Sequence, residues 1–156
     1  NAELFIRSGN NAIGNAVIPG MNIMLGYKLN PYFTAGSEMG IEFYDRMVMP
    51  LSASFRMRSG NRGLSPFIIL RGGYSFPAEK RKDDWEYSYD SFGGVHSTAG
   101  FGIERIINSN TSFILSLAYH YQELNYHLTP LQPWVQERDR TEAFSRMRLS
   151  LGYAFK

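Results

Sequence analysis

The final segment of the chain, residues 146–155, alternates large apolar side chains with polar or small ones almost without exception. Successive side chains of a β-strand point to opposite faces of a sheet, so this pattern predicts a strand with one apolar and one polar face. The apolar positions are Met147, Leu149, Leu151, Tyr153 and Phe155. Such a strand constrains the fold to a sheet whose two faces meet different surroundings.

The same period of two recurs along most of the chain, and no segment has a convincing helical period. No apolar run approaches the ~18 residues of a transmembrane helix. The expected strands cover residues 2–8, 21–29, 32–44, 47–58, 66–76, 93–107, 112–124 and 144–155. The sequence therefore predicts an all-β meander, with residues 1–156 forming one domain.

The expected connections alternate in length, apart from a short link at 45–46. Short turns are expected at 30–31, 60–63 and 108–111, and longer connections at 10–20, 77–92 and 123–143. Up-and-down barrels of the outer membrane have short periplasmic turns and long outer loops. We therefore expect an eight-stranded antiparallel up-and-down transmembrane β-barrel, with the long loops extracellular and both termini periplasmic.

A soluble, lipocalin-like ligand-binding barrel would show the same alternation with its apolar face turned inward. Glycine on the polar face favours the opposite arrangement, because exposed strand glycines weaken a soluble sheet, whereas in a narrow lumen they leave room for long side chains. These glycines are Gly26, Gly36, Gly40, Gly73, Gly100, Gly102 and Gly152. Tyrosine and phenylalanine also gather near the strand ends, where membrane-interface belts place them.

Three motifs, at residues 25–31, 65–76 and 149–155, resemble the small eight-stranded outer-membrane barrels of the OmpA/OmpX type, in the form common in Bacteroidetes. The resemblance covers essentially the whole chain. It implies an outer-membrane location amid lipid and lipopolysaccharide, and insertion by the barrel-assembly machinery. It also implies that Tyr153 and Phe155 form the assembly signal, although Lys156 follows them. An exported chain would carry its leader before Asn1.

The polar face collects charges of both signs, which we expect to meet in the lumen. The members of this predicted network are Lys28, Glu38, Glu42, Arg56, Arg58, Arg71, Glu104, Arg146 and Arg148. Strand direction places an arginine at a depth similar to that of each carboxylate, as buried charges require. Because eight strands enclose little beyond their own side chains, we expect this network to fill the barrel and leave no conducting pore.

The sequence gives little support for a catalytic site or a metal site. His96-Ser97 invites comparison with outer-membrane lipid A deacylases, but adjacent strand residues point to opposite faces and cannot act as base and nucleophile there. His120 with Glu104 or Glu123 lacks a further ligand at useful spacing for a metal. We expect no catalytic residue, metal or cofactor. An outer-membrane enzyme acting on lipid A or peptides through a lumen or loop histidine remains the alternative.

Composition excludes some partners and suggests others. The net charge of +2 gives no bulk argument for nucleic acid, and the absence of cysteine excludes a disulfide scaffold. Trp85, Tyr87, Tyr89 and Trp134 lie in the two longest expected loops and are candidate partner contacts, since Trp and Tyr are common interface anchors. The expected role is a structural or binding protein, or an accessory subunit that contacts another outer-membrane protein through small outward residues such as Ser37, Gly72 and Ser97.

Overall fold

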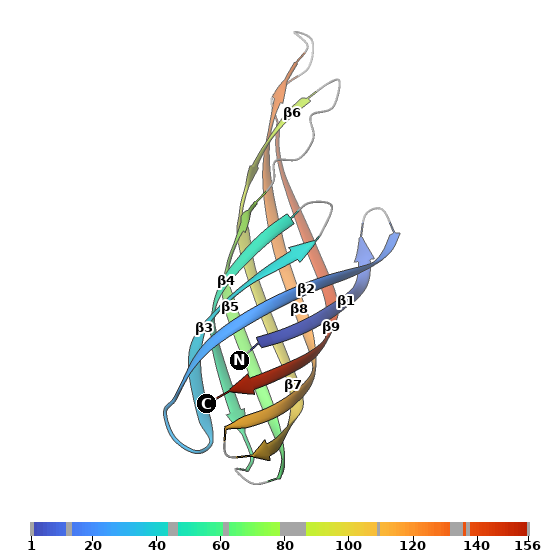
Figure 1. The fold of residues 1–156 in the computed structure, drawn as a ribbon. Coiled ribbons are helices and arrows are strands. Elements are labelled where there is room, and N and C mark those ends of the chain that lie inside the picture. The colour runs from blue at the N-terminus through green and yellow to red at the C-terminus, as the bar shows by residue number, and fades with distance from the viewer. Residues whose placement is uncertain are drawn as a thin grey trace.

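The computed structural model describes residues 2–11, 14–43, 47–60, 63–78, 87–108, 110–131, 136 and 138–155. These residues form nine strands (Figure 1). Their bounds are β1 (Ala2–Asn11), β2 (Gly14–Lys28), β3 (Phe33–Phe43), β4 (Met47–Arg58), β5 (Leu64–Pro77), β6 (Tyr87–Phe92), β7 (Gly94–Asn108), β8 (Thr111–Pro130) and β9 (Arg138–Phe155). The described ranges contain no helix that is long and apolar enough to cross a membrane.

Eight of the strands pair in a continuous ring. The order is β1-β2-β3-β4-β5-β7-β8-β9, every neighbouring pair is antiparallel, and β9 pairs in turn with β1. Leu151 marks this junction, since it lies opposite Leu4 on one side and Leu115 on the other. The predicted all-β, eight-stranded, antiparallel up-and-down barrel is therefore confirmed.

The two ends of the barrel differ in the connections that they hold. The β2–β3, β4–β5 and β7–β8 connections lie toward the end that also holds both termini, which we call the turn end (Figure 1). Residues 29–32 form one of these connections, where Asn30 Oδ1 accepts the backbone N–H groups of Tyr32 (2.8 Å) and Phe33 (2.9 Å). An asparagine side chain that caps its own turn in this way fixes a tight reversal between strands.

Most side chains inside the ring are polar, apart from a buried apolar cluster of Phe67, Ile69, Ile114 and Ala154, and apolar side chains cover the outside. The buried side chains include Arg146, Arg148 and Glu42, each no more than 2% exposed. Among the described residues, 32 large hydrophobic side chains are exposed, and they occur on all of β2, β3, β4, β5, β7, β8 and β9. This distribution is the reverse of a soluble barrel, whose apolar face forms its core.

Several strands extend beyond the sequence-based expectation, and the predicted long connections are wrong to that extent. β2 begins at Gly14 and pairs with β1 from there, so most of the expected connection at 10–20 is strand. Gly14, Pro19 and Gly20 interrupt the alternation and so hide the strand in the sequence. At the other connections, β6 covers residues 87–92, β8 runs to residue 130 and β9 begins at residue 138.

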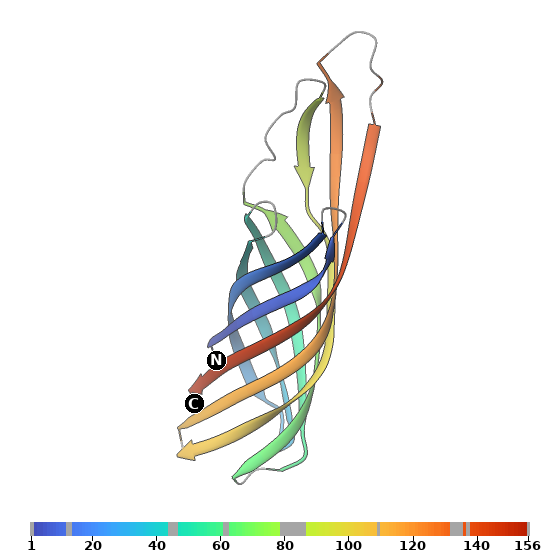
Figure 2. The ribbon, with the colours of Figure 1, turned by 90° about the vertical axis from the view of Figure 1, so that its right-hand side faces the viewer.

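The prolonged parts of β8 and β9 join β6 in a three-stranded sheet that projects beyond the ring (Figures 1 and 2). Its inner face packs Leu124, Tyr126 and Leu128 against Val48 and the partly buried Phe144. Along β8 the apolar side chains thus change faces. From Phe113 to Tyr121 most of them point outward, with Ile114 and Ala118 buried as exceptions, and from Leu124 to Leu128 they point inward.

Candidate functional site

Glu38 lies at the centre of the lumen charges. Its carboxylate meets Arg71 through Nε at 2.7 Å and Arg148 through a terminal nitrogen at 3.8 Å. Asn22 Nδ2 donates to the same carboxylate. These partners come from β5, β9 and β2, so one side chain on β3 ties together strands from across the ring. We call Asn22, Glu38, Arg71 and Arg148 the lumen cluster.

A second group of charges lies at the turn end. Arg58 donates from Nε to the backbone oxygen of Pro31 at 2.6 Å and lies 3.7 Å from Glu104, whose other oxygen accepts from Ser112 Oγ at 2.6 Å. Arg56, Arg58 and Glu104 are buried, whereas Lys28 is exposed. With neighbouring residues these four side chains line a hollow of about 300 Å³. Lys28 is therefore placed at the mouth of the barrel rather than inside it.

The remaining predicted lumen residues are also buried. Glu42 and Arg146 are each 1% exposed. Two arginines lie over aromatic rings, Arg56 over Phe67 at 4.8 Å and Arg146 over Phe144 at 5.1 Å, measured from Cζ to the ring centroid. Aromatic faces attract a guanidinium group and help to offset the loss of its hydration.

A polar group that the sequence did not reveal lies on β5, β7 and β8. Ser75 Oγ is 3.0 Å from His96 Nδ1 and donates to Gln122 Oε1 at 2.9 Å. Nearby, Thr98 Oγ1 is 2.7 Å from His120 Nδ1, and the two histidine rings are 5.9 Å apart. All of these side chains are buried. Ser75 shares the polar face of its strand, but only the strand register brings it to His96.

The side chains of His96 and Ser97 point to opposite faces of the sheet, as the sequence predicts. His96 is buried and Ser97 is exposed. Ser97 belongs to a row of small outward positions in the register, in which Ser37 pairs with Ala53, Ala53 with Gly72 and Gly72 with Ser97. A Cβ added at Gly72 would meet no atom within 4 Å, so packing inside the chain does not require glycine there.

The structure describes only some of the residues that the sequence predicts to contact a partner or to form the assembly signal. Trp85 and Trp134 lie outside the described residues. Tyr87 and Tyr89 lie in β6, where they pair with Pro130 and Leu128 of β8. In the last strand, Tyr153 and Phe155 are exposed and their rings meet edge to face, 4.7 Å apart. Their predicted part in assembly stays a prediction.

Within the described ranges, no three histidine, aspartate or glutamate side chains lie close enough together to hold a metal ion. His120 is the histidine that sequence analysis considered for such a site, and its Nδ1 lies 2.7 Å from Thr98 Oγ1. Glu123, which was considered as its companion, instead accepts a hydrogen bond from Tyr121 at 2.5 Å.

Comparison with known proteins adds little to this geometry. No protein-family model matches the chain, and no curated protein matches it in sequence. Among solved structures, the chain is similar to the NanC porin in its rhombohedral crystal form, with 12% identity over 100% of both chains and a TM-score of 0.41. The fold assignment therefore rests on the pairing of the chain's own strands.

Proposed function

We propose that the protein is an integral outer-membrane β-barrel with a polar, side-chain-filled lumen, and that it acts as a structural or binding protein. The observation that carries this proposal is the reversal of inside and outside. Charged side chains are buried within the ring while large apolar side chains cover its outer wall. Water would oppose that arrangement, whereas hydrocarbon favours it, and closure of the ring leaves no unpaired strand edge in the wall.

The length of the apolar wall also fits a bilayer. On β8 the outward apolar residues run from Phe113 to Tyr121, a stretch of nine residues. A transmembrane strand needs ~9–11 residues to cross the hydrocarbon. Beyond Tyr121 the outward side chains become Glu123, Asn125 and His127, which belong in water. The projecting sheet would then stand outside the membrane, with the turn end and the termini on the periplasmic side.

The lumen cluster supports a structural lumen rather than a conducting one. Arg71, Glu38 and Arg148 connect three strands across the narrow interior, and each is at most 5% exposed. A barrel of eight strands has an interior about wide enough for its own side chains. The binding function would then belong to the projecting sheet of β6, β8 and β9, or to contacts of the barrel wall with a larger outer-membrane complex.

The experiment that tests the membrane assignment is refolding of the full chain with and without lipid vesicles. We expect the chain to float with the vesicles and to migrate faster on gels before heating than after it, as a closed barrel does. A folded β-rich monomer that remains in detergent-free buffer would overturn the assignment. Isolation from native membranes in mild detergent then tests the accessory role, for which a stoichiometric membrane-protein partner is expected.

The alternative of an enzyme draws its support from Ser75 and His96, whose 3.0 Å separation suits a nucleophile and its base. We propose that this pair is structural, because both side chains are buried and Ser75 also donates to Gln122. Hydrolysis of lipid A or of peptide substrates that is lost in Ser75→Ala and His96→Gln, with the barrel still folded, would reverse this interpretation.

A further inference from the structure

We propose that the outer wall of β7 and β8 binds one phospholipid of the periplasmic leaflet, with an acyl chain in an apolar groove and the phosphate at Arg105. This inference rests on the membrane placement proposed above. It goes further by assigning a ligand class and a residue to one part of the wall.

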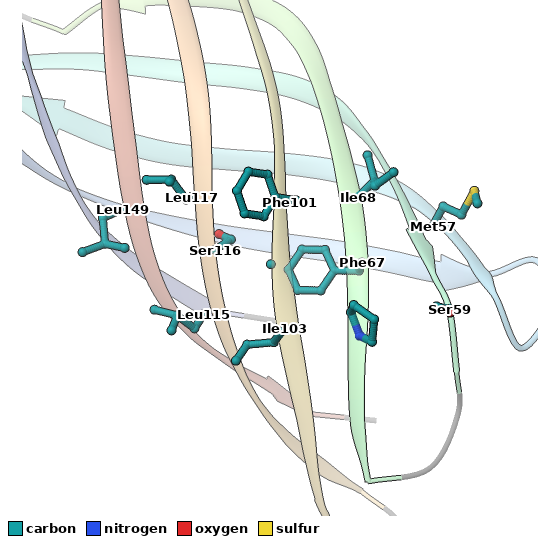
Figure 3. A pocket seen from close by; sticks show the side chains of 12 residues that line it. Met57, Ser59, Phe67, Ile68, Phe101, Ile103, Leu115, Ser116, Leu117 and Leu149 are labelled. Carbon is teal, nitrogen blue, oxygen red and sulfur yellow. The ribbon is translucent and has the colours of Figure 1, made fainter.

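The groove has a volume of about 630 Å³ and is lined almost wholly by apolar side chains. Phe101 and Ile103 of β7 face Leu117 and Leu115 of β8 in the register, with Ile68 of β5 beside them (Figure 3). All five side chains are exposed. Sites for small lipophilic ligands have volumes of ~300–1,000 Å³, so the groove is large enough for part of an acyl chain.

Arg105 lies just beyond the groove, on the side nearer the turn end. It is two residues beyond Ile103 on β7, which places it about 7 Å farther along the same face of the strand. Its neighbours in the register, Leu64 and Phe113, are both exposed apolar residues. Arg105 also lines a second hollow, of about 390 Å³, together with Ile106, Ile107 and Phe113. A shift in register between Ile106 and Asn108 alters the strand just beyond it.

The order of these features along the wall matches a phospholipid. A charged side chain facing hydrocarbon is costly at mid-membrane and tolerated near the interface, so the exposed Arg105 marks the level of the headgroups. A guanidinium group presents a planar fork of N–H donors that suits two phosphate oxygens. A phosphodiester at Arg105 would direct its acyl chain away from the turn end and into the groove.

The phosphate could come from a phospholipid or from free inorganic phosphate, and the experiment separates the two sources. Native mass spectrometry would be applied to the full chain, refolded in micelles and titrated with dioleoyl phosphatidylglycerol. We expect one retained lipid per chain. Arg105→Gln should weaken this retention roughly tenfold, the effect of one charge-assisted contact, and Arg105→Lys should restore part of it. Ile103→Trp should block the groove and have a similar effect.

Matched control variants are available elsewhere on the chain. Arg138→Gln removes one exposed positive charge from the projecting sheet, and Ile23→Trp adds the same bulk to the exposed face of β2. Both should retain lipid as the wild type does. Inorganic phosphate should compete weakly, because it lacks the acyl chain.

Equal retention by the wild type, Arg105→Gln and Arg138→Gln would overturn the proposal, as would full competition by inorganic phosphate. A heat-dependent gel shift is recorded for every variant, so that a loss of lipid counts only for a folded barrel. Failure of the wild type to enter vesicles would refute the membrane placement. Normal insertion without selective retention would refute the phospholipid site alone.

Discussion

Replacement of Glu38 by glutamine tests whether the lumen cluster holds the barrel together. Glu38 and Arg71 have side chains only 3% and 2% exposed, and the substitution leaves Arg71 and Arg148 buried without the carboxylate between them. Removal of one partner from a buried ion pair costs ~3–5 kcal/mol. Because glutamine keeps one acceptor oxygen for Asn22, we expect Glu38→Gln to lower the free energy of unfolding by about 3 kcal/mol, the low end of that range.

The matched control is Glu142→Gln in the projecting sheet. Glu142 pairs with Arg140 at 2.9 Å, and the side chains of Arg140 and Glu142 are 47% and 18% exposed. Glu142 also accepts a hydrogen bond from the Tyr126 hydroxyl, which the amide oxygen of glutamine can still accept. Solvent-exposed ion pairs contribute about 0–1 kcal/mol, so this variant should unfold at nearly the same urea concentration as the wild type.

The assay is equilibrium urea unfolding of the full chain in lipid vesicles, followed by circular dichroism and by the heat-dependent gel shift. A double-mutant cycle with Arg71→Gln would isolate the Glu38–Arg71 term, which should be about 0.5–3 kcal/mol for directly contacting residues. If Glu38→Gln loses no more stability than Glu142→Gln, the charges in the lumen fill space without holding the strands, and the reasoning is wrong.

Three further predictions follow from the wall and the lumen. Leu117→Arg, which places a charge on the outer face of β8, should lower the free energy of unfolding in vesicles by ~2–4 kcal/mol, whereas Thr129→Arg at an exposed position of the projecting sheet should change it by less than about 0.5 kcal/mol. A Cβ at Gly102 would clash with the backbone oxygen of Leu115 and lie 2.5 Å from the Phe67 ring, so Gly102→Ala should cost ~1–3 kcal/mol by overpacking, while Gly72→Ala should be nearly neutral in the same assay. In planar bilayers the wild-type chain should show no steady conductance, and a steady single-channel current would contradict the filled lumen.

The alternation of side chains was sufficient to predict the fold class and the inner position of most charges. Arg71, Arg146 and Arg148 lie on the polar face of their strands whatever the register is, so their burial follows from the period of two. Depth and partner do not follow, because they depend on how the ring is staggered. Arg148 of β9, for example, reaches Glu38 of β3, although these two strands are not neighbours in the ring.

The register also explains why the contacts among Ser75, His96 and Gln122 could not be predicted from the sequence. Ser75, His96 and Gln122 are far apart in the chain, and their contact requires the alignment of β5 with β7 and of β7 with β8. In that alignment His96 is directly opposite Gln122, while Ser75 is two residue pairs away along β5 and β7, opposite Gly94. A single sequence carries no signal for such an alignment, since several registers preserve the same division of polar and apolar faces.

The strand ends were misjudged for a different reason, which bears on function. A search for continued alternation ends at Leu124, because from there the apolar residues of β8 occupy the other face. The hydrogen-bonded strand itself continues without a break to Pro130. What changes is the solvent on each side. In the proposed membrane placement, hydrocarbon surrounds the wall as far as Tyr121 and favours outward apolar residues there. Beyond that level water surrounds the strand and favours an apolar interior, which Leu124, Tyr126 and Leu128 supply.

If the chain is placed in the membrane as proposed above, the reversal locates the outer edge of the membrane on this strand. Tyr121 is the last outward apolar residue, and its hydroxyl donates to Glu123, the first outward charge. A tyrosine at this level keeps its ring toward hydrocarbon and its polar tip toward water, as interfacial aromatics do. The polar contacts beyond it, His127 with Asp139 and Thr141 with Asn125, are those of an ordinary water-exposed sheet. One strand thus serves first as barrel wall and then as part of a projecting sheet, and the charges inside the wall need not take part in whatever that sheet binds.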